Sequence, residues 1–60
     1  MFLPADNFIL LSIINTKLRD EYSSLEELCA EESVSIEEIR NRLHGLGYDY
    51  SPEQNAFMRV

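Results

Sequence analysis

Two serines eleven positions apart, each followed three residues later by a glutamate, constrain the fold of this 60-residue chain more than any other feature. The pairs are Ser24 with Glu27 and Ser35 with Glu38. In such a capping box the hydroxyl accepts the backbone N–H at the third helical position, and the glutamate reaches back to the cap's own N–H. Apolar residues at helical spacing follow each box. The pattern therefore predicts two short helices joined by a tight turn, a helix-turn-helix.

The apolar spacing indicates which side of each of these helices is buried. The helix expected from about residue 25 to residue 32 turns Leu25 and Leu28 inward, and the small Cys29 lets two helices approach. The next helix begins after Ser35 and ends at Gly47, a natural C′ residue. Its inward stripe is expected to consist of Ile36, Ile39, Leu43 and Leu46, and its outward residues of Glu37, Glu38, Asn41, Arg42 and Gly45.

A longer helix is expected to precede this unit, from about residue 7 to residue 22, with Asp6 or Asn7 as its N-cap. At 100° per residue one face of this helix carries an apolar stripe, which we expect to meet the other helices: Phe8, Leu11, Ile14, Leu18 and Tyr22. Asn15 lies within the same stripe. It is either a site residue or, as we favour, a core asparagine that bonds a backbone group.

The C-terminal part of the chain changes to an alternating pattern. Residues 48–50 read Tyr-Asp-Tyr, and residues 56–60 form a second extended run. Between them Pro52 presets φ and Asn55 tolerates a left-handed backbone, so a β-hairpin is predicted. The chain is thus expected to be α+β: a three-helix helix-turn-helix unit followed by a C-terminal β-hairpin, in a single domain over residues 1–60.

This order of elements is that of the winged helix-turn-helix proteins, and residues 24–48 resemble that family's sequence pattern. The resemblance implies a winged-helix-like domain with the hairpin as its wing. Two residues depart from the pattern: Glu32 stands where the family usually has an apolar residue, and Ser33 replaces the usual turn glycine. The matching positions are Ser24, Glu27, Leu28, Cys29, Val34, Ser35, Ile39, Leu43 and Leu46.

A second resemblance covers nearly the whole chain. It rests on the runs LLS at residues 10–12, NTKLRD at 15–20 and YSSL at 22–25, and on GY at 47–48, EQN at 53–55 and Phe57. In these runs the chain is similar to a family of bacterial proteins of about this length, described only as a domain of unknown function. The resemblance implies a bacterial source and a complete protein. It carries no activity that could be transferred to this chain.

The charge distribution argues against nucleic acids and anionic membranes as partners. The net charge is −6, and no Lys or Arg interrupts the acidic residues between Asp20 and Glu38. Such a surface repels phosphate groups. The single cysteine, Cys29, excludes an internal disulfide, and with the single histidine, His44, it cannot form a structural zinc site, so no metal or cofactor is expected. The N-terminus lacks the pattern of a signal peptide, and a cytoplasmic location is expected.

Two functions from different classes remain open at this point. In a DNA-binding helix-turn-helix the start of the last helix enters the major groove. Here that start carries Glu37 and Glu38, so we favour a non-enzymatic protein-interaction module over a DNA-binding regulator. No residue set points to catalysis, because the paired carboxylates are neighbours on helix surfaces and diverge. In the alternative, nucleic acid would be bound by Arg40, Asn41, Arg42, His44 and Arg59.

The favoured function predicts a homodimer. Ile9 and Ile13 lie one turn apart on the side of the first helix away from its core stripe, and the apolar Phe2 and Leu3 precede Pro4. We expect these four apolar residues to form the partner-binding patch. In the competing account Phe2 and Leu3 fold back over the isoleucines, or the hairpin covers them, and the protein is a monomer.

Three charged residues near the end of the first helix are most simply a solvated surface: Lys17, Arg19 and Asp20. Arg19 is alternatively placed to reach an acid of the following helix. The tyrosines of the hairpin are expected to cover a small core rather than to stack on bases, and Cys29 is expected to be inert packing.

Overall fold

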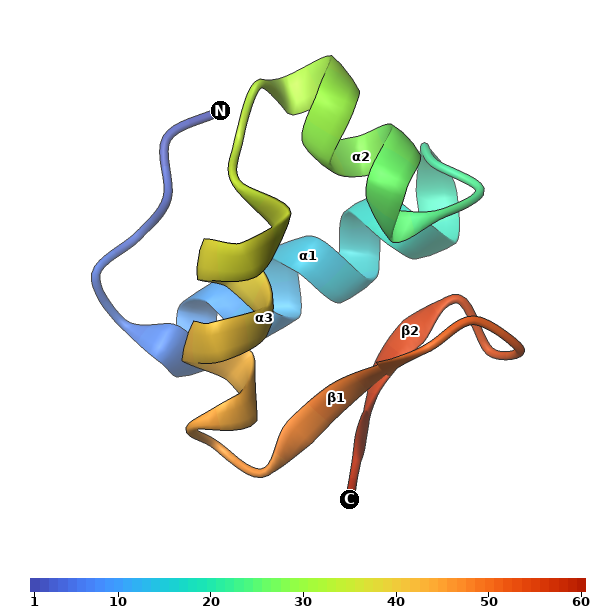
Figure 1. Ribbon diagram of the computed structural model, residues 1–60. Helices are drawn as coiled ribbons and strands as arrows, with labels where there is room; N and C mark the ends of the chain where they lie inside the picture. Colours follow the sequence, from blue (N-terminus) through green and yellow to red (C-terminus); the bar gives the residue numbers. More distant parts are fainter.

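Three helices precede a two-stranded antiparallel hairpin in the computed structural model, which describes residues 1–60 (Figure 1). This order confirms the α+β fold expected from the sequence. In Figure 1 α2 lies above α1, α3 overlaps the N-terminal part of α1, and the hairpin lies below α1. The elements are α1 (Asn7–Asp20), α2 (Leu25–Glu32), α3 (Ile36–His44), β1 (Tyr48–Ser51) and β2 (Ala56–Arg59).

Both predicted serine caps are confirmed. The Ser24 hydroxyl accepts the Glu27 backbone N–H at 3.0 Å, and the Ser35 hydroxyl accepts that of Glu38 at 3.2 Å. The returning half of each capping box is wrong. The Glu27 carboxylate accepts the N–H of Ser23, one residue before the cap, at 2.7 Å, and the Glu38 carboxylate turns to a guanidinium one turn later in α3. A long carboxylate side chain can serve either partner, so the sequence pattern fixed only the serine half.

The turn between α2 and α3 has the geometry that a glycine would normally provide. Ser33 is left-handed, with φ 58° and ψ 47°, and its N–H donates to the Cys29 carbonyl. The N–H of Val34 donates to the same carbonyl at 3.0 Å. These bonds satisfy the end of α2 as a helix C-cap does. The departure at position 33 therefore leaves the turn conventional and puts the strain into one serine.

The core lies between the three helices and the inner face of the hairpin. The predicted stripe of α1 is wrong at its first turn: Phe8 is 66 % exposed, and Leu10 is completely buried. Two residues apart on a helix, these side chains point about 160° away from each other, so only one of them can face the core. The buried residues are Leu10, Ile14, Leu18, Leu25, Leu28, Cys29, Ile39, Leu43 and Phe57.

Two helix ends fall earlier than the sequence indicated. The first helix ends at Asp20, where Asn55 Nδ2 donates to the backbone carbonyls of Leu18 and Tyr22 at 3.0 and 2.9 Å. Asn55 holds these contacts from a left-handed backbone with φ 50°, as its turn position predicted. The third helix ends at His44, and residues 45–47 form turns.

The hairpin is fixed to α1 by Asn15, which confirms the structural interpretation of this residue. Its Oδ1 accepts the Phe57 N–H at 2.7 Å, and its Nδ2 donates to the Phe57 carbonyl at 3.2 Å. In an antiparallel pair of strands, only every second residue directs its N–H and C=O at the partner strand. Phe57 directs its N–H and C=O away from β1, toward the free edge of β2. Asn15 thus occupies part of an edge that could otherwise pair with another strand.

Candidate functional site

The first six residues form an ordered segment, here called the N-terminal strap, that runs along one side of the molecule from the end of α2 to the start of α1 (Figure 1). At its beginning the Met1 ammonium donates to the Glu32 carbonyl at 2.9 Å and lies 3.9 Å from the Glu32 carboxylate. The Met1 side chain is 5 % exposed, and both Met1 and Leu3 pack against the core. The strap is therefore part of the folded unit.

The other end of the strap is held by Arg42. Its guanidinium donates to the Pro4 and Ala5 carbonyls, the second at 3.2 Å, and its Nε donates to Asn7 Oδ1 at 2.7 Å. The Asn7 amide donates back to the Arg42 carbonyl at 3.4 Å. The expectation that Arg42 points outward is thus wrong. Its contacts lie 35 to 38 positions away in the chain, where no helical pattern can reveal them.

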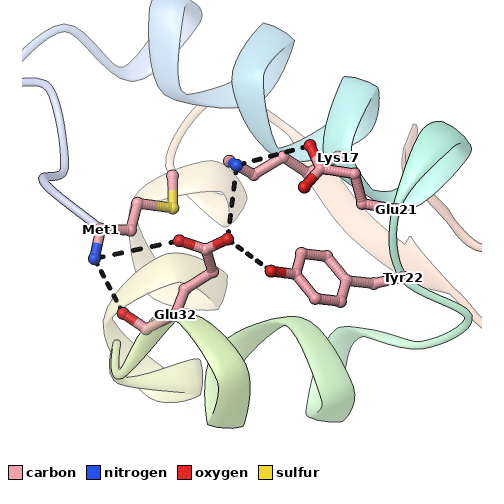
Figure 2. A network of polar contacts seen from close by, with 5 residues as sticks. All are labelled: Met1, Lys17, Glu21, Tyr22 and Glu32. Atoms are coloured by element: carbon pink, nitrogen blue, oxygen red, sulfur yellow. Dashed lines mark hydrogen bonds and ion pairs between the residues drawn. The ribbon is translucent and has the colours of Figure 1, made fainter.

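Glu32, the second departure from the winged-helix pattern, is the centre of a polar cluster between α1, α2 and the strap. Figure 2 shows its carboxylate between the Met1 ammonium, the Lys17 amine and the Tyr22 hydroxyl. Tyr22 donates to Glu32 Oε2 at 2.5 Å, and Lys17 Nζ lies 3.3 Å from the same oxygen. The cluster was not predicted from the sequence. Its only signal was a glutamate at a position that usually carries an apolar residue.

The hydrogen bond between Tyr22 and Glu32 perturbs both groups. The bond, burial and the nearby carboxylates raise the pKa of Tyr22 to about 12. The same bond lowers the pKa of Glu32 below its usual value, against burial and with help from Lys17. The pKa of Lys17 is raised, first by its bond to Glu32. The fold therefore keeps the phenol neutral and the carboxylate charged.

The cluster also resolves the open question about the charged end of α1. Arg19 does not reach α2: its guanidinium bonds the adjacent Asp20 carboxylate at 2.8 and 3.0 Å. This bond is the first cause of the raised pKa of Arg19 and the lowered pKa of Asp20. Lys17 is the residue that reaches α2, through Glu32.

The predicted partner-binding residues differ in how far their side chains are exposed. Phe2 is 91 % exposed and Ile9 is 53 % exposed, whereas Ile13 is half-buried. Leu3 is partly buried, and its side chain packs against the core. Phe8, which the sequence assigned to the core, lies exposed beside Ile9 on α1. That these residues bind a partner stays a prediction.

Three of the five predicted nucleic-acid residues line one cavity, and two do not. Arg40, Asn41 and His44 line a shallow cavity of about 410 Å³ on the outward side of α3. Glu37 and Asp49 line the same cavity, and the Arg40 guanidinium lies 3.6 Å from the Asp49 carboxylate. The remaining two do not line this cavity: Arg42 holds the strap, and Arg59 is on β2, the strand that packs on α1.

A larger cavity, of about 590 Å³, lies between α1 and the hairpin turn. Its lining includes Ser12, Thr16 and Gln54, together with the Asn15 and Asn55 amides that hold the hairpin. The cavity is open and its strongest polar groups are already bonded within the fold. It offers hydroxyl and amide groups and no convergent set of charges.

The remaining candidates have structural roles. Cys29 is buried, and burial raises the pKa of its thiol, which disfavours the reactive thiolate. Tyr48 and Tyr50 pack against the core, as expected, and the Tyr50 hydroxyl donates to Asn55 Oδ1 at 2.7 Å.

No group of three His, Cys, Asp or Glu side chains is arranged to hold a metal ion. No helix has the length and apolar character needed to cross a membrane.

Comparison with known proteins identifies one family. The family model described as "Domain of unknown function (DUF4250)" matches residues 4–57. No curated protein matches the chain. No solved structure matches it either, so the likeness to winged-helix proteins stays a resemblance in sequence pattern and element order.

Proposed function

The chain belongs to the DUF4250 family of domains of unknown function, and from its geometry we propose that it is a non-enzymatic interaction module that self-associates through the outer face of α1. We define this outer face as Phe8, Ile9 and Ile13, with Phe2 of the strap as a further contact. The observation that carries the proposal is that Phe8 and Ile9, large apolar side chains in one helical turn, are 66 % and 53 % exposed.

These side chains have no role within the monomer that would explain them. Phe8 and Ile9 are not among the residues that pack against the core, and neither is Phe2. Single exposed apolar residues are common on protein surfaces. Here three large ones lie within the first nine residues, and such a group of exposed apolar side chains is typical of an interaction surface. Aromatic side chains are also the residues that contribute most at protein interfaces.

Charge favours a second copy as the occupant of this face. No charged residue occurs between Asn7 and Thr16, so two copies can meet here without opposing like charges. The acidic residues instead populate α2 and the start of α3, where contact between two copies of a −6 chain would bring carboxylates together. A two-fold interface needs one self-complementary patch on each copy.

The size of the domain supports the same proposal. A chain of this length hides only about 60% of the surface that its unfolded form exposes. It has no disulfide, and its only cysteine is free. Association of the folded form would stabilise it by mass action.

The same geometry supports the proposal that the domain is not a catalyst. The Glu32 carboxylate has a lowered pKa, and three donors already surround it: Met1, Lys17 and Tyr22. Neither cavity brings a nucleophile, a base and a charge-stabilising group together.

Nucleic-acid binding is the weaker alternative. The observation in its favour is that Arg40, Asn41 and His44 share the outward side of α3. Against it, Glu37 and Asp49 flank these residues, and Arg40 already pairs with Asp49. Retention on duplex DNA at low salt, with affinity that falls steeply as salt rises, would favour this alternative.

Sedimentation velocity over a range of protein concentrations tests self-association. We expect the wild type to become dimeric and Ile9→Glu to stay monomeric with an unchanged circular dichroism spectrum. A buried carboxylate without a partner costs several kcal/mol, so the dimer should weaken by about a hundredfold or more. The matched control is Ala30→Glu, which adds the same charge at an exposed position of α2 and should leave the dimer intact. A wild-type monomer at the highest soluble concentration would contradict the proposal.

A further inference from the structure

We propose that the free α-ammonium group of Met1 is a docking group for the N-terminal strap, so that acylation of this nitrogen releases the strap from the folded domain. The proposal is independent of self-association. It rests on the contacts of Met1 with the end of α2 and on the burial of its side chain.

The end of α2 requires a positive charge that the helix does not contain. Backbone dipoles place partial negative charge at a helix C-terminus, and cations are favourable there. The last turn of α2 has no basic residue, and its last two residues are Glu31 and Glu32. The helix therefore ends with two carboxylates at its negative pole.

Two cations from other parts of the chain compensate for this charge. Lys17, from α1, lies 3.3 Å from the Glu32 carboxylate. The Met1 ammonium donates instead to the Glu32 backbone carbonyl at 2.9 Å, one of the carbonyls that have no partner within the helix, and lies 3.9 Å from the carboxylate. Figure 2 shows the two amines on different sides of Glu32. Met1 thus caps the helix, a role that Lys17 does not fill.

Acylation removes what this cap requires. In this step the deprotonated α-amine attacks the carbonyl carbon of an acyl thioester, so that the N–C bond forms, the C–S bond breaks, and the thiol leaves with the proton that the nitrogen loses. The α-ammonium carries a positive charge and three N–H donors, whereas an N-acyl nitrogen is a neutral amide with one N–H. The acyl group must also be accommodated beside a side chain that is only 5 % exposed. The amide cannot offset the charges of Glu31 and Glu32.

Release of the strap would change the surface of the domain. Met1 and Leu3 would leave the core against which they pack, and that part of the core would become accessible. The far end of the strap would stay bound through Arg42, which does not depend on the ammonium. The expected product is therefore a locally open domain in which α1 and the hairpin are retained.

The test compares three full-length chains made by chemical synthesis: a free N-terminus, N-acetyl-Met1 and N-ethyl-Met1. The acetyl and ethyl groups have similar size, but the N-ethyl amine keeps its positive charge and two donors. We expect the N-ethyl chain to behave like the free chain. In the N-acetyl chain the folding equilibrium constant should fall by about fivefold, since a cation at a helix C-terminus contributes about 1 kcal/mol and 1.4 kcal/mol is tenfold.

Nuclear Overhauser effects locate the change. In the N-acetyl chain those between the Met1 side chain and the core should disappear, while those between Tyr50 and Phe57 in the hairpin persist. Complete unfolding of the N-acetyl chain, with loss of the contacts between Tyr50 and Phe57, would contradict release of the strap from a domain that stays folded. Equal stability of the acetyl and ethyl chains, or Met1 contacts that survive acetylation, would overturn it.

Discussion

Replacement of Asn15 by alanine should remove about half of the stability of this domain. The substitution deletes both hydrogen bonds that tie β2 to α1, the one of 2.7 Å from the Phe57 N–H and the one of 3.2 Å to the Phe57 carbonyl. Each contributes about 1 kcal/mol net, and a group left without a partner raises the cost further, so we expect a loss of about 2–3 kcal/mol. A single core of this size supplies roughly 3–5 kcal/mol.

Urea unfolding, followed by circular dichroism at one fixed protein concentration, measures this loss, because association would otherwise shift the midpoint. Asn41→Ala is the matched control: it is the same substitution on an exposed helical surface and should change stability by about 0.5 kcal/mol or less. Hydrogen exchange of the Phe57 amide should accelerate in Asn15→Ala alone. Equal midpoints for the two variants, with unchanged Phe57 exchange, would refute the role assigned to Asn15.

Three further substitutions test the turn, the polar cluster and the strap. Ser33→Gly should raise the free energy of unfolding by about 0.5–1 kcal/mol, because glycine adopts the left-handed backbone without strain, and a lower urea midpoint would contradict this. The pKa of Tyr22 is raised from 10.0 to about 12, so its contribution is complete below pH 10 and is lost as pH rises toward 12; Tyr22→Phe should abolish that alkaline loss in urea midpoints measured across this range. Because the pKa of Glu32 is lowered, the contribution of its carboxylate to the free energy of unfolding is present above pH 4.5 and is lost as pH falls through the lowered pKa. The difference in free energy of unfolding between wild type and Tyr22→Phe should therefore shrink at that acidic pH. Arg42→Gln should free the strap at its other end, seen as faster proteolysis before residue 7, and equal proteolysis of both proteins would show that the guanidinium contacts do not hold it.

The features that could be predicted from the sequence are those that neighbouring residues determine. Ser24 and Ser35 cap their helices through groups three residues away, and Asn55 adopts its left-handed backbone within its own turn. The hairpin and the order of the elements follow from the same local signals. The α+β fold could therefore be predicted without knowledge of any long-range contact.

The errors have a common physical cause, which is that distant contacts decide between local alternatives. The choice between Phe8 and Leu10 as the inward residue depends on what packs against the first turn of α1. From the sequence, Arg42 and Glu32 resemble ordinary surface charges. Arg42 bonds Asn7, 35 positions away, and the partners of Glu32 lie 31, 15 and 10 positions away. No periodicity in the sequence records such contacts.

The exposure of the proposed interface residues could be predicted from the sequence only in part, for the same reason. The exposure of Ile9 follows from helical periodicity alone, and it was predicted. Leu3 precedes the first helix, where no helical period applies, and its packing against the core depends on how the strap is held at both of its ends. An apolar residue outside a regular element is thus the kind whose burial the sequence cannot indicate.

An isotope-filtered Overhauser experiment on an equal mixture of labelled and unlabelled protein tests self-association through the outer face of α1 most directly. The signals that remain after filtering arise only between copies of the chain. The account predicts intermolecular contacts at Phe8, Ile9 and Ile13, and none at the exposed side of α2. Intermolecular contacts confined to α2, α3 or the hairpin, or none at a concentration where sedimentation shows a dimer, would contradict it.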